Sequence, residues 1–209
     1  SSACVYNASK QNDTFIDGLK EEDAYPAMPE DGYGWEKLFS ERMCNHFYED
    51  YGLDVKVARY HNVYGPCGTY DGGREKAPAA LARKVITAKK NNADEIEVWG
   101  DGNQKRSFLY IDDCIDASIN LFKSSIHGPL NIGSEELVSI NDMIGILEKI
   151  SEKKFKRKYL LDKPKGVKGR NSDNSLIKKE LNWEPKYSLK EGLKKTYLWI
   201  ERQIKENVK

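Results

Sequence analysis

The feature that most constrains the fold is a long helical repeat at residues 32–51, between two short apolar segments. Its larger apolar side chains recur every four residues, at Trp35, Phe39, Met43, Phe47 and Tyr51. This is a helical period; Asp31 suits its N-cap and Gly52 its C-terminal stop. Residues 1–6 read as the end of a buried strand, and residues 53–60 alternate like a strand. Strand, helix and strand in this order predict a parallel crossover and an α/β sheet.

The remaining residues continue the alternation of strands and helices. The pattern predicts strands at 95–99, 104–110, 129–132 and 154–161, and helices at 79–91, 113–124, 139–152, 174–181 and 189–205. Asp112 is placed to cap the second of these helices. Ser139 with Asp142, and Ser188 with Glu191, have the spacing of capping boxes.

Composition excludes several classes of function. The 209 residues suffice for one large domain or two small ones. The 34 basic and 33 acidic residues give a formal charge of +1, so we expect no nucleic-acid partner. No apolar run reaches the roughly 18 residues of a membrane span, and we expect no membrane partner. The four cysteines form no C-x-x-C pair and the three histidines are scattered, which favours reduced thiols, a cytoplasmic location and no metal site.

Tyr33 and Lys37 lie four residues apart in the helical repeat, and therefore on one face of the predicted helix. An ammonium beside a phenol favours the phenolate and lowers the pKa of the tyrosine from about 10, towards the range in which it can act as a base. Two other pairs with this spacing, beginning at Tyr6 and Tyr159, lie in a polar loop and in a strand-like segment. The spacing alone favours an incidental pair on a surface helix.

Three other segments allow both a functional and a structural interpretation. Lys76 follows the glycine-rich loop 65–73, and by itself it fits a solvated loop lysine. Basic residues among the glycines of 165–174 could bind a phosphate or belong to a solvated linker. Cys4, taken alone, fits a cysteine in a buried strand.

Five ordered motifs, taken together, resemble the extended short-chain dehydrogenase/reductases that act on nucleotide sugars. The motifs are Ser1–Tyr6, Tyr33–Lys37, Arg59–Pro66, Phe108–Asp113 and Asn131–Ser134. Within that family, three stretches are similar to the GDP-mannose 3,5-epimerases, namely Ser1–Cys4, Gly72–Ala80 and Gly166–Asn174. The resemblance implies an α/β fold in two parts. The remainder of an NAD-binding Rossmann-type parallel sheet would occupy 1–66 and 108–133, and a smaller α/β nucleotide-sugar-binding domain 67–107 and 134–209.

The resemblance also implies a chemistry for particular residues. In this family NAD oxidises the sugar at C4; Tyr33 matches the base, Lys37 the group that holds the nicotinamide ribose, and Ser2 a hydrogen-bond partner of the reacting hydroxyl. A 4-ketone acidifies the C–H bonds on both neighbouring carbons. Cys4 and Lys76 match the pair that then exchanges protons, because a thiol beside a cation and a desolvated lysine can both titrate nearer neutrality.

A larger set of residues matches the family's positions for a GDP-sugar substrate. These are Ser2, Ala3, Cys4, Asn62, Glu75, Lys76, Ala77, Lys84, Gln104, Lys105, Arg106 and Arg170. Arg106 and Arg170 suit the diphosphate, since a planar guanidinium pairs with phosphate oxygens. The resemblance further implies a homodimer, because in this family the helix of the catalytic tyrosine packs against a second subunit.

One departure from the family is large. No G-x-x-G-x-x-G or G-x-G-x-x-G run, the fingerprint of dinucleotide binding, occurs in the sequence. We therefore expect this chain to be the carboxyl-terminal part of such an enzyme, without most of the NAD pocket. Two alternatives stay open: a 4-epimerase or 4,6-dehydratase of the same family, and an inactive, truncated nucleotide-sugar-binding module. The dehydratases usually carry an Asp-Glu pair where this chain has Ala3-Cys4.

Overall fold

The computed structural model describes residues 1–11, 17–163 and 168–206, and the chain forms two compact units. Unit 1 comprises Ser1–Val63, Arg106–Leu137 and Val167–Lys186; unit 2 comprises Tyr64–Lys105, Val138–Gly166 and Tyr187–Lys209. The assignment of a cofactor domain and a substrate domain stays a prediction.

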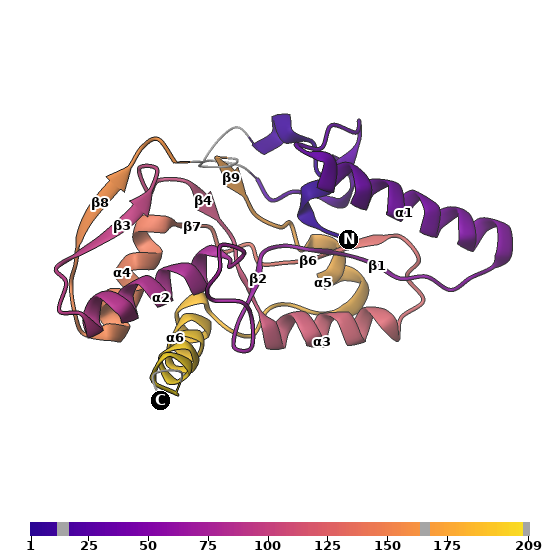
Figure 1. Cartoon of the computed structure of the whole chain (residues 1–209). Helices are drawn as coiled ribbons and strands as arrows, with labels where there is room; N and C mark the ends of the chain where they lie inside the picture. The colour runs from indigo at the N-terminus through magenta and orange to yellow at the C-terminus, as the bar shows by residue number, and fades with distance from the viewer. Residues whose placement is uncertain (12–16, 164–167, 207–209) are drawn as a thin grey trace. The chain divides into compact units, whose positions relative to one another are not determined.

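Helices and strands alternate along the chain (Figure 1). The α-helices are α1 (Gly32–Tyr51), α2 (Ala77–Lys90), α3 (Ile111–Phe122), α4 (Ile140–Ser151), α5 (Ser175–Leu181) and α6 (Leu189–Glu206). The 3-10 helices are η1 (Ala3–Val5), η2 (Ala8–Gln11) and η3 (Glu21–Ala24). The strands are β1 (Val57–Tyr60), β2 (Val63–Tyr64), β3 (Glu95–Trp99), β4 (Lys105–Arg106), β5 (Leu109–Tyr110), β6 (Pro129–Ile132), β7 (Val138–Ser139), β8 (Lys156–Leu160) and β9 (Gly169–Arg170).

Unit 1 is built on parallel strand pairing. Strand β1 pairs with β6 in parallel, from Val57 opposite Pro129 to Tyr60 opposite Ile132. Ser2 forms a parallel bridge to Tyr60 on β1. Helix α3 packs against β1 and β6, and α5 packs against β6 (Figure 1). The predicted parallel crossover is therefore confirmed, with α1 as its helix.

Two apolar clusters form the core of this unit. One lies between α3, β5, β6 and α5, with the buried side chains Leu109, Cys114, Ala117, Leu121, Leu130, Ile132, Ile177 and Trp183. The other lies between η1 and the buried face of α1. Its buried side chains are Ala3, Val5, Tyr6, Leu19, Ala24 and Leu38. The second cluster is the one that supports the segment of Ser2 and Cys4.

Unit 2 has its own parallel pair and its own helical layer. Strand β3 pairs with β8, from Glu95 opposite Lys156 to Trp99 opposite Leu160. Helices α2, α4 and α6 pack on one another, and α2 contacts β3 (Figure 1). The buried positions of α4 include Met143, Ile144 and Leu147, so one apolar face of this helix lies in the core.

The helix ends follow the capping chemistry that the sequence predicts. The Asp31 side chain accepts a hydrogen bond from Gly34 N at 2.8 Å, and Gly52 ends α1 with a left-handed φ of 65°. The Ser139 side chain accepts from Asp142 N at 3.0 Å, which forms the predicted box. The box at the start of α6 forms as well. The predicted ends of these helices are confirmed. Each cap forms between residues that are at most four positions apart, so the local sequence is enough to predict it.

Three strand predictions are wrong in extent. The first segment is extended only at Ser2 and then turns into η1, because the Ser2 hydroxyl accepts a hydrogen bond from Cys4 N at 3.2 Å. The strand predicted at 53–60 begins at Val57. The strand predicted at 104–110 divides into β4 and β5. The backbone between them pairs with a distant segment, since Ser107 N donates to the Arg170 carbonyl at 3.0 Å.

Two further details differ from the sequence pattern. Helix α3 has Tyr110 rather than Asp112 at its N-cap, and Asp112 lies in its first turn, where it still complements the helix dipole. The loop predicted at 165–174 contains β9, although residues 165–167 of that prediction lie outside the described residues.

Membrane and metal features are not found in the part of the chain that the structure describes. In those ranges no helix has the length and hydropathy to cross a membrane. The same residues contain no group of three or more His, Cys, Asp or Glu side chains that could hold a metal ion. Cys4, Cys44, Cys67 and Cys114 are all free thiols.

Candidate active site

Helix α1 brings the predicted tyrosine and lysine together. The Lys37 ammonium lies 5.2 Å from the centroid of the Tyr33 ring. Lys37 also donates a hydrogen bond to Glu36 Oε1 at 3.0 Å, and this contact raises the pKa of Lys37. The Tyr33 side chain is about half exposed. A phenol and a firmly cationic amine therefore share one accessible face of α1.

The segment of Ser2 and Cys4 lies directly against this helix. Helix α1 contacts η1, and a Cβ atom at Gly34 would lie only 2.3 Å from the Cys4 carbonyl oxygen. Any side chain at Gly34 would push α1 away from the segment that it covers. The glycine next to Tyr33 therefore fixes the tyrosine helix close to Ser2 and Cys4.

The cation beside the Cys4 sulfur within unit 1 is Arg170. Its Nη1 atom lies 3.5 Å from Cys4 Sγ. Its other nitrogens are held by Gln11 Oε1 through Nε and, at 3.9 Å, by Glu30 Oε2 through Nη2. Strand β9 thus presents an oriented guanidinium to the predicted catalytic thiol. Lys76, the lysine that the resemblance pairs with Cys4, belongs to unit 2.

A second arginine of unit 1 lies in the same electrostatic environment. The pKa of Arg106 is lowered to about 10, mainly by burial and also by the charge of Arg170, while Glu30 opposes the shift. Two neighbouring guanidinium groups, one of them largely buried, suit a bound anion such as a diphosphate. Asn62 belongs to the same unit. Its Nδ2 atom donates a hydrogen bond to the carbonyl oxygen of Ser107, the residue after Arg106, at 3.1 Å.

Unit 2 holds the remaining predicted substrate residues. Lys76 is exposed and forms the N-cap of α2, which begins at Ala77. Glu75 accepts hydrogen bonds from Arg83 Nη2 at 2.9 Å and from Gly73 N at 2.7 Å. Burial raises the pKa of Glu75, but its hydrogen bonds outweigh burial and the net shift is downward. Glu75 is therefore an ionised anchor for the loop that carries Lys76.

Lys84 and Gln104 also lie together in unit 2. Lys84 Nζ donates to the Glu97 carbonyl at 2.9 Å and lies 5.7 Å from the Trp99 ring centroid, and burial lowers its pKa. Gln104 Nε2 donates to the Trp99 carbonyl at 3.2 Å. The buried Gln104 Oε1 has no hydrogen-bond partner among the described residues, which leaves an acceptor for a ligand. Lys105 follows it in β4.

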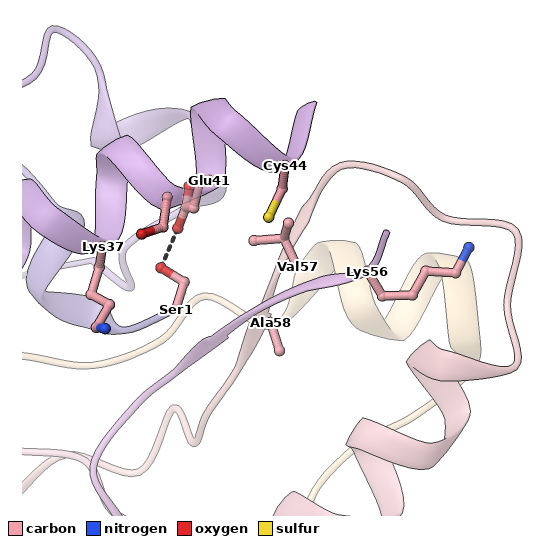
Figure 2. Close-up of a pocket in the computed structure, with 8 residues that line it drawn as sticks. Ser1, Lys37, Glu41, Cys44, Lys56, Val57 and Ala58 are labelled. Carbon is pink, nitrogen blue, oxygen red and sulfur yellow. Dashed lines mark hydrogen bonds between the residues drawn. The ribbon is translucent and has the colours of Figure 1, made fainter. Parts of the chain in front are cut away.

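A cavity of about 200 Å³ opens beside Lys37, between α1 and β1 (Figure 2). Its lining residues are Ser1, Lys37, Ser40, Glu41, Cys44, Lys56, Val57 and Ala58. Figure 2 shows Glu41 projecting from α1 towards Ser1, Lys37 descending from the same helix, and the Lys56 amine extending away from both. The Tyr33–Lys37 pair, on the helix that contacts η1, fits the nicotinamide ribose end of NAD. The sequence has no glycine-rich turn for its phosphates, so these residues fit part of the cofactor.

Sequence reasoning missed three residues that hold this site. Glu41 lies one turn beyond Lys37 and two turns beyond Tyr33, yet it is buried, with 8% of its surface exposed. Arg59, in β1, is 1% exposed and pairs with Glu41. Gly34 permits the close approach to Cys4. The four-residue spacing of Glu41 from Lys37 was a usable signal, whereas nothing local distinguishes Arg59 or Gly34.

The chain matches a known family over most of its length. The sequence pattern of the NAD dependent epimerase/dehydratase family covers residues 1–133. The chain therefore belongs to the NAD-dependent epimerase/dehydratase family.

Particular relatives sharpen this classification. The chain is 50% identical to the GDP-mannose 3,5-epimerase of Arabidopsis thaliana over 206 residues, which are 99% of this chain and 53% of that protein. It is 38% identical to the UDP-glucuronate 4-epimerase of Thermodesulfobacterium geofontis, over 88% of this chain and 54% of that protein. The chain thus spans about half the length of the curated relatives it matches.

Solved structures confirm the predicted Rossmann-type α/β fold. A UDP-glucose 4-epimerase from Thermotoga maritima with UDP-glucose superposes with a TM-score of 0.83 at 25% identity, over 95% of this chain and 62% of that one. A UDP-glucuronic acid 4-epimerase from Bacillus cereus, in complex with UDP-glucuronic acid and NAD, has a TM-score of 0.75 at 28% identity, over 95% of this chain and 60% of that one.

Proposed function

We propose that this chain carries the catalytic groups of an NAD-dependent GDP-mannose 3,5-epimerase. The observation that carries the proposal is the arrangement around Cys4, two residues after Ser2: its backbone carbonyl lies against Gly34 of the Tyr33 helix, and its sulfur lies 3.5 Å from a guanidinium nitrogen of Arg170. A 4-epimerase has no use for a thiol at this position. The 50% identity to the Arabidopsis thaliana enzyme supports the same choice.

The first step is oxidation of the sugar at C4. NAD, when bound, supplies the acceptor for the hydride that leaves C4. Tyr33, as the phenolate, takes the proton of the C4 hydroxyl, and Ser2 donates a hydrogen bond that orients this hydroxyl. The Lys37 ammonium stabilises the phenolate through its charge and binds the ribose.

The second step is proton exchange at the two carbons beside the ketone. The 4-ketone acidifies the C–H bonds at C3 and C5. Cys4 and Lys76 remove and return these protons from opposite faces of the ring, which inverts each carbon. Arg106 and Arg170 hold the diphosphate through charge-assisted hydrogen bonds while the ring reacts. Reversal of the first step then gives GDP-L-galactose from GDP-D-mannose.

The defining test follows deuterium during turnover of the full-length protein. GDP-mannose and NAD are incubated with it in deuterated water, and the sugar is analysed by NMR. We expect deuterium at C3 and C5. Label at neither carbon would refute the proposal.

Substitution of the thiol separates this reaction from that of a 4-epimerase. Cys4→Ser should reduce exchange at least about 100-fold, because a hydroxyl is a far weaker acid than a thiol at neutral pH. The exposed Cys67 gives the matched control, and Cys67→Ser should leave exchange unchanged. Full turnover by Cys4→Ala would favour a 4-epimerase.

A non-enzymatic binding module is the second candidate, favoured by the missing glycine-rich fingerprint. Calorimetric titration of the present chain with NAD and with GDP-mannose distinguishes the two cases. A module would bind the sugar nucleotide alone, whereas a chain that holds the catalytic part of the cofactor site binds both.

We further propose a homodimer formed through α1, in a cytoplasmic protein. The stripe of Trp35, Phe39, Met43, Phe47 and Tyr51 is exposed along the whole helix, and apolar stripes of this length on soluble proteins usually mark interfaces. Light scattering should give twice the chain mass, and Phe39→Glu should reduce it to one chain. A monomeric wild-type protein would refute the dimer.

A further inference from the structure

Glu41 of α1 and Arg59 of β1 form a buried ion pair, one helical turn beyond Lys37. Arg59 Nη2 donates to Glu41 Oε2 at 2.7 Å, and Arg59 Nε lies 3.0 Å from Oε1 and 3.2 Å from Oε2. Ser1 Oγ donates to the same carboxylate (Figure 2). One carboxylate on α1 therefore binds both strand β1 and the residue that precedes Ser2.

Helix α1 buries few of its residues, although Tyr48 near its end also stacks on His127. Of its residues only Gly34, Leu38 and Glu41 are buried. Gly34 provides close approach and Leu38 provides apolar area, but neither is directional. The forked bond between Glu41 and Arg59 is directional, because both partners are planar and charged.

Arg59 is itself held rigidly. Its Nη1 donates to the Glu21 carbonyl at 2.6 Å, and its Cζ lies 5.2 Å from the centroid of the Tyr6 ring. Strand β1 is paired through Arg59 with Asn131 of β6. The ion pair between Arg59 and Glu41 therefore fixes the position of α1 relative to strands β1 and β6.

The spacing of the side chains relates this bond to the reaction. Tyr33, Lys37 and Glu41 follow one another at four-residue intervals, each about 6 Å along the helix axis. Burying an ion pair is a weak source of stability, because desolvation of both charges opposes their attraction. A buried pair on this face is therefore better explained by orientation than by stability.

Resting on the proposed function, we propose that Glu41 and Arg59 are positioning residues. Together they orient the Tyr33–Lys37 face of α1 over Ser2 and Cys4, so that phenol and hydroxyl meet the same sugar oxygen. Displacement of reacting groups by about 1 Å lowers rates by up to about 100-fold. The arginines assigned to the diphosphate are not on α1, so substrate binding should depend little on this pair.

Steady-state kinetics of the full-length Glu41→Gln protein with NAD and GDP-mannose provide the first test. We expect kcat to fall about 10- to 100-fold per folded molecule, with KM changed by less than about two-fold. The isotope effect with C4-deuterated substrate should increase, because hydride departure becomes slower. Glu49→Gln, on the exposed part of α1, is the matched control and should leave all three quantities unchanged. An unchanged kcat and isotope effect in Glu41→Gln would overturn the proposal.

Cysteine alkylation tests the same inference without substrate or cofactor. Iodoacetamide labelling, resolved by peptide mass spectrometry, should proceed several-fold faster at Cys4 in Glu41→Gln, because a shifted α1 uncovers it. The buried Cys114 of unit 1 reports global opening, and its rate should stay constant. Equal acceleration of labelling at Cys4 and Cys114 would show that the Glu41–Arg59 pair only stabilises the fold, and it would overturn the proposal.

A double variant covers the case in which Glu41→Gln does not fold. Glu41→Leu with Arg59→Met removes both buried charges and should fold, but it lacks the directional bond. We expect its kcat to stay as low as that of Glu41→Gln, and Cys4 to label rapidly. Recovery of wild-type kcat would overturn the positioning role. If the wild-type protein shows no turnover, the proposed function fails, while the Cys4 and Cys114 rates still decide this inference.

Discussion

Helices α1 and α4 use apolar residues in opposite ways. In α4 the periodic apolar positions are buried, and Met143, Ile144 and Leu147 are each 0% exposed. In α1 the periodic apolar positions are the exposed ones, with Phe39 at 67%, and a carboxylate is buried instead. The same helical period thus predicts a core face in one helix and an external face in the other.

The difference follows from what each helix must contact. Helix α4 packs against α2 and α6 within unit 2, so its burial is decided by apolar area. Helix α1 is held within unit 1 by its buried residues Gly34, Leu38 and Glu41, the last paired with Arg59, and by the stacking of Tyr48 on His127. Its apolar stripe is available for a partner. A helix that carries catalytic groups is held here by directional bonds, and a helix of the scaffold by packing.

Truncation of one apolar side chain in each helix should give the largest contrast. Leu147→Ala in α4 should lower the free energy of unfolding by about 3 kcal/mol, because it leaves a cavity in a close-packed core. Phe39→Ala in α1 should change it by less than about 0.5 kcal/mol at concentrations where the protein is monomeric. Urea unfolding measures both. Similar losses for the two variants would remove the distinction between the helices.

A pair of glycine substitutions tests how closely α1 is seated. Gly34→Ala should cost about 2 kcal/mol of stability, because its Cβ would lie 2.3 Å from the Cys4 carbonyl oxygen and the helix would have to shift. Gly32→Ala meets nothing within 4 Å and should be neutral or stabilise the helix by up to about 1 kcal/mol. Both values come from denaturant titrations. A tolerated Gly34→Ala would mean that α1 does not need this contact.

The stability that buried polar groups give to unit 1 should also depend on pH, unlike the stability that the apolar core around α4 provides. Burial lowers the pKa of His61 to about 4, while its bond to Asn131, 2.9 Å long, partly opposes the shift and the charges of Arg170 and Arg59 add to it. The unfolded chain binds a proton near pH 6.5, so stability is retained above that pH and lost as pH falls from about 6.5 to 4. At pH 5 this loss is about 2 kcal/mol relative to pH 7.

Comparison with His61→Gln isolates that contribution. Unfolding free energies of both proteins are measured at pH 7 and pH 5, and the wild type should lose about 2 kcal/mol more than the variant. Equal losses would show that His61 does not titrate in a buried state.

The sequence predicted much of the fold because its signals are local. Helix α1 and its caps at Asp31 and Gly52, and the capping box at Ser139, depend on residues within a few positions of each other. The 3-10 turn at η1 was missed because residues 1–6 end in the short apolar run of a buried strand. The hydrogen bond from Cys4 N to the Ser2 hydroxyl, which starts the turn, competes with that strand over the same few residues. The extent of β4 and β5 was missed because their ends are set by residues far along the chain, such as Arg170.

In the candidate site, too, some features could be predicted from local sequence and others could not. The Tyr33–Lys37 pair follows from helical spacing, and its geometry in α1 agrees. The guanidinium beside Cys4 does not follow from spacing, since Arg170 is 166 residues away in sequence. The roles assigned to Cys4, Lys76 and the substrate residues stay predictions.

The sequence alone determined the order of elements, the helix termini and the face of α1 that carries a phenol and an amine. Those properties arise from periodicity and from hydrogen bonds over a few residues. Only the tertiary structure decided that Glu41 and Arg59 share a buried bond, that Gly34 lies on the Cys4 backbone, and that the apolar stripe of α1 is exposed. Each of these depends on which distant segments meet, and that is set by the packing of the whole unit.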